Sequence, residues 1–89
     1  MLIVTCGDSF TVGEGLSDKT QAYPYLLQNH YKAELINLAQ SGASEYLITT
    51  QIEEAVKLKP NLIVVGHTSE YRWQVWDARN EITQGFLVA

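Results

Sequence analysis

The sequence predicts a single α/β domain in which a parallel β-sheet lies between helices. Three short apolar runs, residues 2–6, 35–39 and 62–65, have the length and apolar composition of strands buried in a sheet, and the first is also rich in β-branched residues. Two segments with the apolar spacing of helices separate these runs. Strands that alternate with helices pair in parallel, and right-handed crossovers on opposite faces place the first strand in the middle, in the order 2-1-3. The 89 residues suffice for one small domain, 1–89.

The first part of the chain supplies a strand, a loop and a helix. The strand over 2–6 ends at Gly7, and residues 7–18, rich in Gly, Ser, Asp and Thr, predict a loop. Pro24 is tolerated in the first turn of a helix over 21–31. That helix is predicted by side chains spaced at i, i+3, i+4 and i+7, namely Tyr23, Leu26, Leu27 and His30.

The middle of the chain predicts a second strand, a second helix and a third strand. The run over 35–39 is expected to be a buried strand, followed by a polar turn. Ser44 is a suitable N-cap for the next helix, and Glu45 is well placed against the helix dipole. Pro60 stops this helix before the strand over 62–65, which again ends at a glycine.

The tail differs in kind from the rest of the chain. Loose alternation before and after turn-forming residues indicates either an irregular segment or a β-hairpin over 71–88. Trp73 and Trp76 could face a sugar or a lipid, but the sequence favours a role in covering the open edge of the sheet. Three strands are few for an open sheet, so an apolar edge is expected to remain unpaired and to favour self-association.

Composition and charge exclude several classes of protein. Apolar residues make up 46% and charged residues 18%, which is typical of a folded globular domain. A net charge of −4 disfavours nucleic acid as a partner. No apolar run is long enough for a membrane span, and the first residues lack the features of a signal peptide, so a cytoplasmic protein is expected. One cysteine and scattered histidines predict neither an internal disulfide nor a metal site, and no cofactor is expected.

Ser9 is the strongest candidate for chemistry. It lies two residues beyond the glycine that ends the first strand, and the carboxyl ends of parallel strands are where α/β sheets bind ligands. A hydroxyl nucleophile needs exposure at a rigid strand end, with backbone N–H groups nearby to receive an oxyanion. The alternative interpretation is that Asp8 and Ser9 only form a turn or cap the following segment.

Two further segments reach the same edge of the predicted sheet. Gly42 follows the second strand and precedes a helix, so its backbone N–H could approach a bound oxygen without obstruction. Thr68 follows the third strand and could add a side-chain donor, although Thr68 or Ser69 could equally cap a local turn. The sequence therefore predicts a site assembled from separated segments.

Together these segments resemble the N-terminal part of the SGNH, or GDSL-type, hydrolases, serine esterases and lipases with a three-layer, flavodoxin-like α/β fold. The first family block is matched by Gly7-Asp8-Ser9, the second by Asn37, Ser41 and Gly42, and the third by Gly66. The resemblance covers about residues 1–72. It implies that Ser9 is the nucleophile and that the N–H groups of Ser9 and Gly42 hold the oxyanion. Thr68 stands where the family has a donor asparagine, and Gly-x-Thr-Ser with a following arginine resembles phage-encoded members.

The sequence departs from the family at the catalytic base. The family carries it in a C-terminal Asp-x-x-His, whereas the segment with that spacing here, residues 77–80, ends in Asn80, which cannot take a proton at neutral pH. His30 is expected to pack on a helix face. His67 follows Gly66 and is a weaker candidate base, because the sequence shows no acid to orient it. A truncated or partial hydrolase domain is therefore expected.

Two functions follow from the sequence. The first is hydrolysis of a small carboxyl ester (a lipid, an acetylated sugar or another acyl ester) through Ser9, with Gly42 and Thr68 in the oxyanion hole and activity impaired by the missing base. The alternative is a non-catalytic interaction or structural module on the same fold, which could be phage-encoded. The intact Gly7-Asp8-Ser9 favours the first function, and the missing Asp-x-x-His favours the second.

Overall fold

A three-stranded parallel sheet forms the centre of the protein. The structure is a computed structural model that describes residues 1–69, 72–76 and 82–86, the last two ranges as strands only. Strand β1 (Leu2–Cys6) lies between β2 (Glu34–Asn37) and β3 (Leu62–Val65). Both neighbours pair with β1 in parallel, with the Cα of Val4 opposite those of Ile36 and Ile63. The predicted order 2-1-3 is thereby confirmed.

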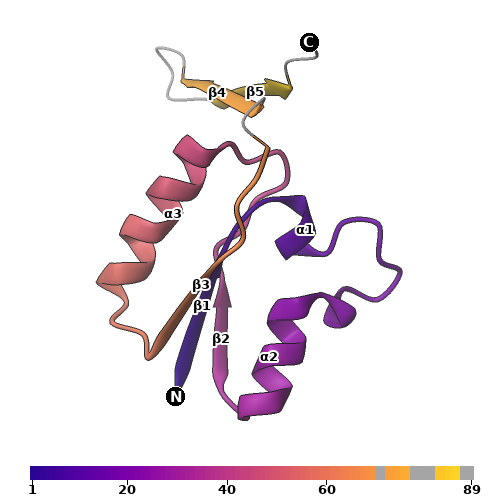
Figure 1. Cartoon of the computed structure of the whole chain (residues 1–89), viewed down its shortest axis with the longest axis vertical. Coiled ribbons are helices and arrows are strands. Elements are labelled where there is room, and N and C mark those ends of the chain that lie inside the picture. Colours follow the sequence, from indigo (N-terminus) through magenta and orange to yellow (C-terminus); the bar gives the residue numbers. More distant parts are fainter. Residues whose placement is uncertain (70–71, 77–81, 87–89) are drawn as a thin grey trace.

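Helices flank this sheet on both sides, which gives the predicted three layers. Figure 1 shows α3 (Glu45–Lys57) on one side of the strands, and α1 (Ser9–Val12) and α2 (Tyr23–Tyr31) on the other. Helix α2 has its proline in the first turn, as predicted. Ser44 caps α3, since its hydroxyl accepts a hydrogen bond from the N–H of Leu47 at 3.3 Å.

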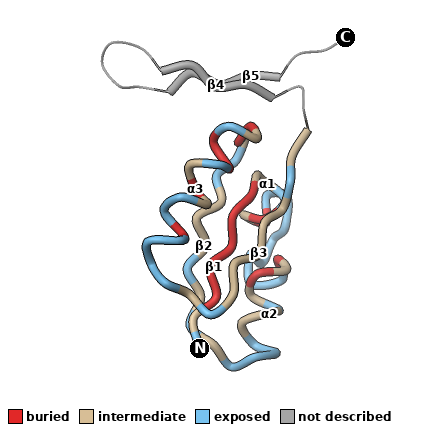
Figure 2. Tube along the Cα trace, turned by 60° about the vertical axis from the view of Figure 1, so that its left-hand side comes forward, coloured by how far each residue is buried: buried red, intermediate tan, exposed pale blue. Residues whose placement is uncertain are grey.

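The core lies mainly between β1 and α3. Val4 and Cys6 of β1 are fully buried, and Figure 2 shows β1 as the most continuously buried strand. These side chains belong to a buried cluster that α3 and the turn before it complete with Ala43, Leu47, Ile48 and Ala55. Burial of Cys6 raises the pKa of its thiol, so the thiol stays protonated at neutral pH and is a packing residue.

Two expectations about individual elements were wrong. Residues 7–18 are not all loop, because Asp8 starts the short helix α1 by accepting a hydrogen bond from the N–H of Phe10. The second strand is not buried, because β2 is an edge strand whose residues alternate between exposed and partly buried, with Ile36 36% exposed. The apolar composition of β2 resembles that of a central strand, but β2 is less buried because it has a neighbouring strand on one side only, β1.

The tail forms the hairpin that the sequence predicts as one of two alternatives. Strands β4 (Arg72–Trp76) and β5 (Ile82–Phe86) pair antiparallel, with the Cα of Gln74 opposite that of Gln84. The side chains of Trp73 and Trp76, and residues 77–80 with Asn80, lie outside the described residues. In the described part of the chain, no helix is long and apolar enough to cross a membrane. Self-association through the sheet edge stays a prediction.

One buried polar group in the central strand gives a stability prediction. The hydroxyl of Thr5 is fully buried and has no hydrogen-bond partner among the described residues. A buried hydroxyl without a partner costs about 1–3 kcal/mol of desolvation, and valine has nearly the same shape without the hydroxyl. We expect Thr5→Val to raise the free energy of unfolding by about 1 kcal/mol in a urea titration. A loss of stability in this variant would show that the hydroxyl has a partner in solution.

Candidate active site

Two glycines at the ends of β1 and β3 allow α1 to pack tightly against the sheet. A Cβ on Gly7 would lie 2.2 Å from Oγ1 of Thr11, and a Cβ on Gly66 would lie 2.7 Å from the same atom. Thr11 is buried in α1, and its hydroxyl lies 2.9 Å from that of Tyr23 in α2. Because glycines occupy these two strand ends, Thr11 and therefore α1 can lie close to the sheet.

Ser9 is the first residue of α1, and Gly7 and Asp8 separate it from the end of β1. Asp8 is the N-cap, with its Oδ1 accepting a hydrogen bond of 3.0 Å from Phe10 N–H. The capping role that the sequence left open for Asp8 is thus observed, and it places the Ser9 side chain at the carboxyl edge of the sheet. Ser9 is partly buried, and no hydrogen bond of its hydroxyl to another described residue is found.

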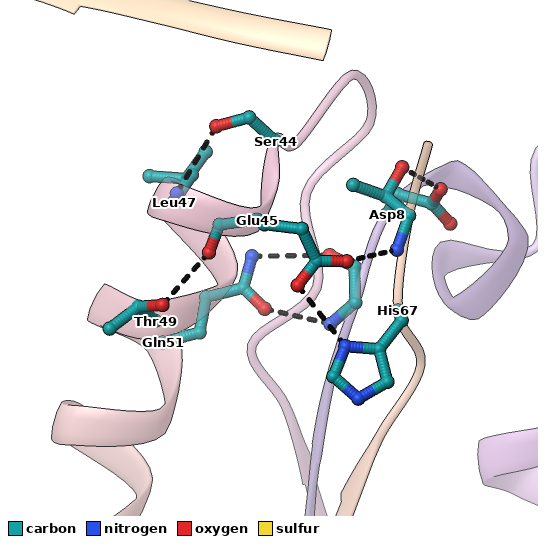
Figure 3. A network of polar contacts seen from close by, with 9 residues as sticks. Asp8, Ser44, Glu45, Leu47, Thr49, Gln51 and His67 are labelled. Carbon is teal, nitrogen blue, oxygen red and sulfur yellow. Dashed lines mark hydrogen bonds and ion pairs between the residues drawn. The ribbon is translucent and has the colours of Figure 1, made fainter. Parts of the chain in front are cut away.

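Thr68 contacts the same loop through its side chain. Its hydroxyl donates a hydrogen bond of 2.5 Å to Oδ2 of Asp8, the residue before Ser9 (Figure 3). The third strand end is thereby tied to the first across 60 positions of sequence. A threonine hydroxyl has a single hydrogen to donate. Thr68 therefore lies next to the Ser9 segment, but its proton is used by Asp8.

Gly42 lies in the turn between β2 and α3, with a positive φ of 77° that favours glycine. This turn contacts the ends of β1 and α1 through the N–H of Gln40, which donates to the carbonyl of Gly7 at 3.2 Å. The hydroxyl of Ser41 also donates to Glu14 Oε1 at 2.8 Å. The second predicted segment is thus brought to the same sheet edge as Ser9.

Glu45 joins two residues of the third segment. Its carboxylate accepts hydrogen bonds from the backbone N–H of Thr68 at 2.7 Å and pairs with Nδ1 of His67 at 3.1 Å. The expectation that no acid orients His67 was wrong, because Glu45 does so from the first turn of α3. In Figure 3 the other ring nitrogen, Nε2, points away from Asp8. His30 lies on α2, exposed, with its ring edge-on to Tyr31, as expected.

Gln51 is a residue of this edge that sequence reasoning missed. Its side chain is only 5% exposed and forms two hydrogen bonds with the backbone of Gly7. Oε1 accepts from Gly7 N–H at 2.7 Å, and Nε2 donates to the Gly7 carbonyl at 3.1 Å. A buried glutamine at a helix position predicted to face the core is the signal that could have identified it.

A small apolar hollow lies beside α1. It has a volume of about 300 Å³. Phe10, the neighbour of Ser9, lines the hollow and is 79% exposed, and Glu14 at its rim holds Ser41, the neighbour of Gly42. Its other apolar lining comes from Leu16, Ala22, Tyr23 and Leu26. Within the described residues, no group of three or more acidic, His or Cys side chains could hold a metal ion.

The topology and the three strand ends define the fold of the N-terminal part of GDSL-type hydrolases. A lipolytic protein of the G-D-S-L family from Desulfitobacterium hafniense DCB-2 superposes with a TM-score of 0.62 and 20% identity, over 72% of this chain and 37% of that one. A mutant of the esterase AlinE4 superposes with a TM-score of 0.64 and 28% identity, over 78% of this chain and 40% of that one.

The chain thus spans about two fifths of the length of these two structures. No protein-family model matches the sequence, and no curated protein matches it.

Proposed function

We propose that the protein contributes the nucleophile and the oxyanion hole of a serine hydrolase that acts on carboxyl esters. The single observation that carries this proposal is the convergence of the Gly7-Asp8-Ser9 segment, the Gly42 turn and Thr68 at one sheet edge, tied by the Asp8–Thr68 and Gln40–Gly7 hydrogen bonds. The GDSL-type fold of the two solved structures supports it.

Each predicted residue has a chemical role in this proposal. The hydroxyl oxygen of Ser9 attacks the ester carbonyl carbon, and the bond to the alcohol oxygen breaks after a tetrahedral intermediate. The backbone N–H groups of Ser9 and Gly42 donate to the oxyanion. Water then attacks the acyl-serine, releases the acid and restores Ser9. Thr68 can donate to the oxyanion only after its hydroxyl leaves Asp8, so its first role is to position the Ser9 segment.

The base is the part of this mechanism that the described residues leave unassigned. The printed sequence contains no Asp-x-x-His, and His67, although oriented by Glu45, directs Nε2 away from Asp8. A serine hydroxyl without a base reacts slowly, and losing a triad member costs about four orders of magnitude in rate. The 89-residue chain alone is therefore expected to react weakly.

The apolar hollow beside Phe10 supports an ester with an apolar acyl group. Its volume of about 300 Å³ is sufficient for a medium-length alkyl chain. Each buried methylene stabilises a bound chain by about 0.8 kcal/mol. A fluorophosphonate with a long alkyl chain should therefore react faster than a short one.

Labelling with an alkyl fluorophosphonate tests the proposed function. We expect slow covalent labelling of the wild-type chain, measured by intact mass, and acceleration by added imidazole, which supplies a base. Ser9→Ala should remove the label, because phosphorus bonds to the Ser9 oxygen as fluoride leaves. Ser17→Ala is the matched control, since Ser17 is an exposed serine of the neighbouring loop, and it should label like the wild type.

The outcomes separate the two functions. Label that persists in Ser9→Ala, or no label even with imidazole, would refute Ser9 as a nucleophile and would favour the non-catalytic module. Rapid labelling without imidazole that is lost in His67→Ala would instead identify His67 as the base.

A further inference from the structure

The side chain of Gln51 binds the backbone of Gly7 just beyond the end of β1. The pairing of β1 with β2 ends where the N–H of Leu38 donates to the carbonyl of Thr5 at 2.8 Å. In a parallel strand the N–H and C=O of one residue point to the same side, and those of the next residue to the other. The Cys6 carbonyl accordingly bonds to Gly66 on the β3 side, at 2.8 Å. The polar groups of Gly7 therefore turn toward the β2 side, where Gln40 N–H, just after β2, already donates to the Gly7 carbonyl at 3.2 Å.

A primary amide offers the same donor and acceptor as a peptide group. The carboxamide of Gln51 binds both backbone groups of Gly7, at 2.7 and 3.1 Å, from a position that is 5% exposed. It thus supplies the acceptor for Gly7 N–H and, beside Gln40 N–H, a second donor for the Gly7 carbonyl. An apolar residue of similar size would fill the space but leave both groups of Gly7 without this partner.

We infer that Gln51 is a positioning residue for Ser9. Its two hydrogen bonds fix the peptide groups on both sides of Gly7, and these lead directly into Asp8 and Ser9. The direction of the Ser9 N–H and hydroxyl relative to the Gly42 turn then depends on a side chain of α3. The claim that Gln51 affects catalysis rests on the proposed function. The claim that Gln51 fixes the backbone of Gly7 and Ser9 does not.

The ionisable groups around Gln51 define the conditions of a test. Asp8 follows Gly7 directly, and Cys6 precedes it with a buried thiol. Glu53 and Glu54 line a cleft of about 490 Å³ that Gln51 also lines, between α3 and residues 37–40. A change confined to position 51 can therefore be compared with Glu53→Gln, which alters charge on the same cleft at an exposed position.

Three variants test the inference. Gln51→Met preserves volume and removes both hydrogen bonds. Gln51→Glu retains both while its carboxyl is protonated, and loses the donor when the carboxyl ionises, because a carboxylate can only accept. Burial raises the pKa of such a carboxyl above its usual value of about 4.3, so this loss should occur as the pH rises toward neutral. Glu53→Gln is the control.

Two readouts are compared with wild type at each pH between 5.5 and 8.5: the fluorophosphonate labelling rate and the hydrogen-exchange rate of the Gly7 amide measured by NMR. In Gln51→Met we expect labelling at least about tenfold slower and exchange at least about tenfold faster, since small displacements of a nucleophile carry large costs. Gln51→Glu should label like Gln51→Met near pH 8 and like wild type at the acidic end. Its Gly7 amide should stay protected throughout, because the ionised carboxylate still accepts from Gly7 N–H. Glu53→Gln should stay like wild type.

A folded Gln51→Met that labels within twofold of wild type, with a protected Gly7 amide, would overturn the inference. So would a Gln51→Glu variant whose labelling rate, relative to wild type, does not change with pH. If the wild type itself never labels, the proposed function fails, and the Gly7 exchange and the Ser9 amide resonance alone decide the role of Gln51. An unshifted Ser9 resonance in both Gln51 variants would refute it.

Discussion

Gly7→Ala should lower the free energy of unfolding by more than about 3 kcal/mol. The new Cβ would lie 2.2 Å from Oγ1 and 2.8 Å from Cβ of Thr11, both in a fully packed region. Overpacking typically costs about 1–3 kcal/mol, and two overlaps with a buried side chain on a short helix should exceed that. A domain of this size has a free energy of unfolding of about 4–13 kcal/mol. Circular dichroism with a urea titration measures the loss.

A second substitution and a control identify the cause. Thr11→Ala removes Oγ1, so Gly7→Ala combined with Thr11→Ala should be more stable than Gly7→Ala alone. A Cβ on Gly15 would meet no atom within 4 Å, so Gly15→Ala should cost only the strain of its positive φ of 85°, about 1 kcal/mol. Wild-type stability of Gly7→Ala would show that α1 does not pack on Gly7 as described.

Asp8→Ala should lower the free energy of unfolding by about 2.5–4 kcal/mol, because one carboxylate has two structural roles. Losing the helix cap to Phe10 N–H costs about 1 kcal/mol. Losing the charge-assisted bond from the Thr68 hydroxyl, 2.5 Å long, costs about 1.5–3 kcal/mol more. The Thr68 hydroxyl is then released for another acceptor.

A double-mutant cycle with Thr68→Val isolates the long-range bond. We expect a coupling free energy of at least about 1 kcal/mol between Asp8 and Thr68, and a value near zero would mean that their bond is absent in solution. Asp18→Ala is the matched control, because Asp18 caps the short 3-10 helix Lys19–Gln21 through hydrogen bonds within its own turn, chiefly to Thr20. It should cost less than Asp8→Ala.

The Asp18 control also has a defined pH dependence. Hydrogen bonds from the hydroxyl and backbone N–H of Thr20 lower the pKa of Asp18 below its value of 3.8. The native state therefore favours the ionised form, so this contribution is present above that pH and is lost as the pH falls below it.

The sequence predicts the sheet because its signals are local. An apolar run followed by a polar turn that contains a glycine, repeated three times with helical periods between, specifies both the strands and the order 2-1-3. How deeply a strand is buried depends on the elements that pack beside it. The exposure of β2 therefore follows from its place at the edge of the sheet and could not be predicted from its apolar composition. Helix α1 was missed because a four-residue helix has no periodicity, and its one signal is the capping residue Asp8.

The residues predicted for the site reach the same sheet edge, but the bonds that hold them there could not be predicted. Gln51 and Glu45 act on backbone groups 44 and 23 positions away, and no local pattern reports a contact of that kind. The sequence identified Glu45 only as a favourable charge at the start of a helix. Its contact with His67 depends on where β3 ends relative to α3, which is a property of the packed structure.

The Asp8–Thr68 bond also has a consequence for synthesis of the chain on the ribosome. The two residues are 60 positions apart, and at about 5–20 residues per second the second emerges about 3–12 s after the first. During that interval Gly7 and the helix cap Asp8 have already been made, but Thr68, which follows the third strand, has not. The segment around Ser9 is thus among the earliest parts of the protein to be made and among the last to reach its final geometry.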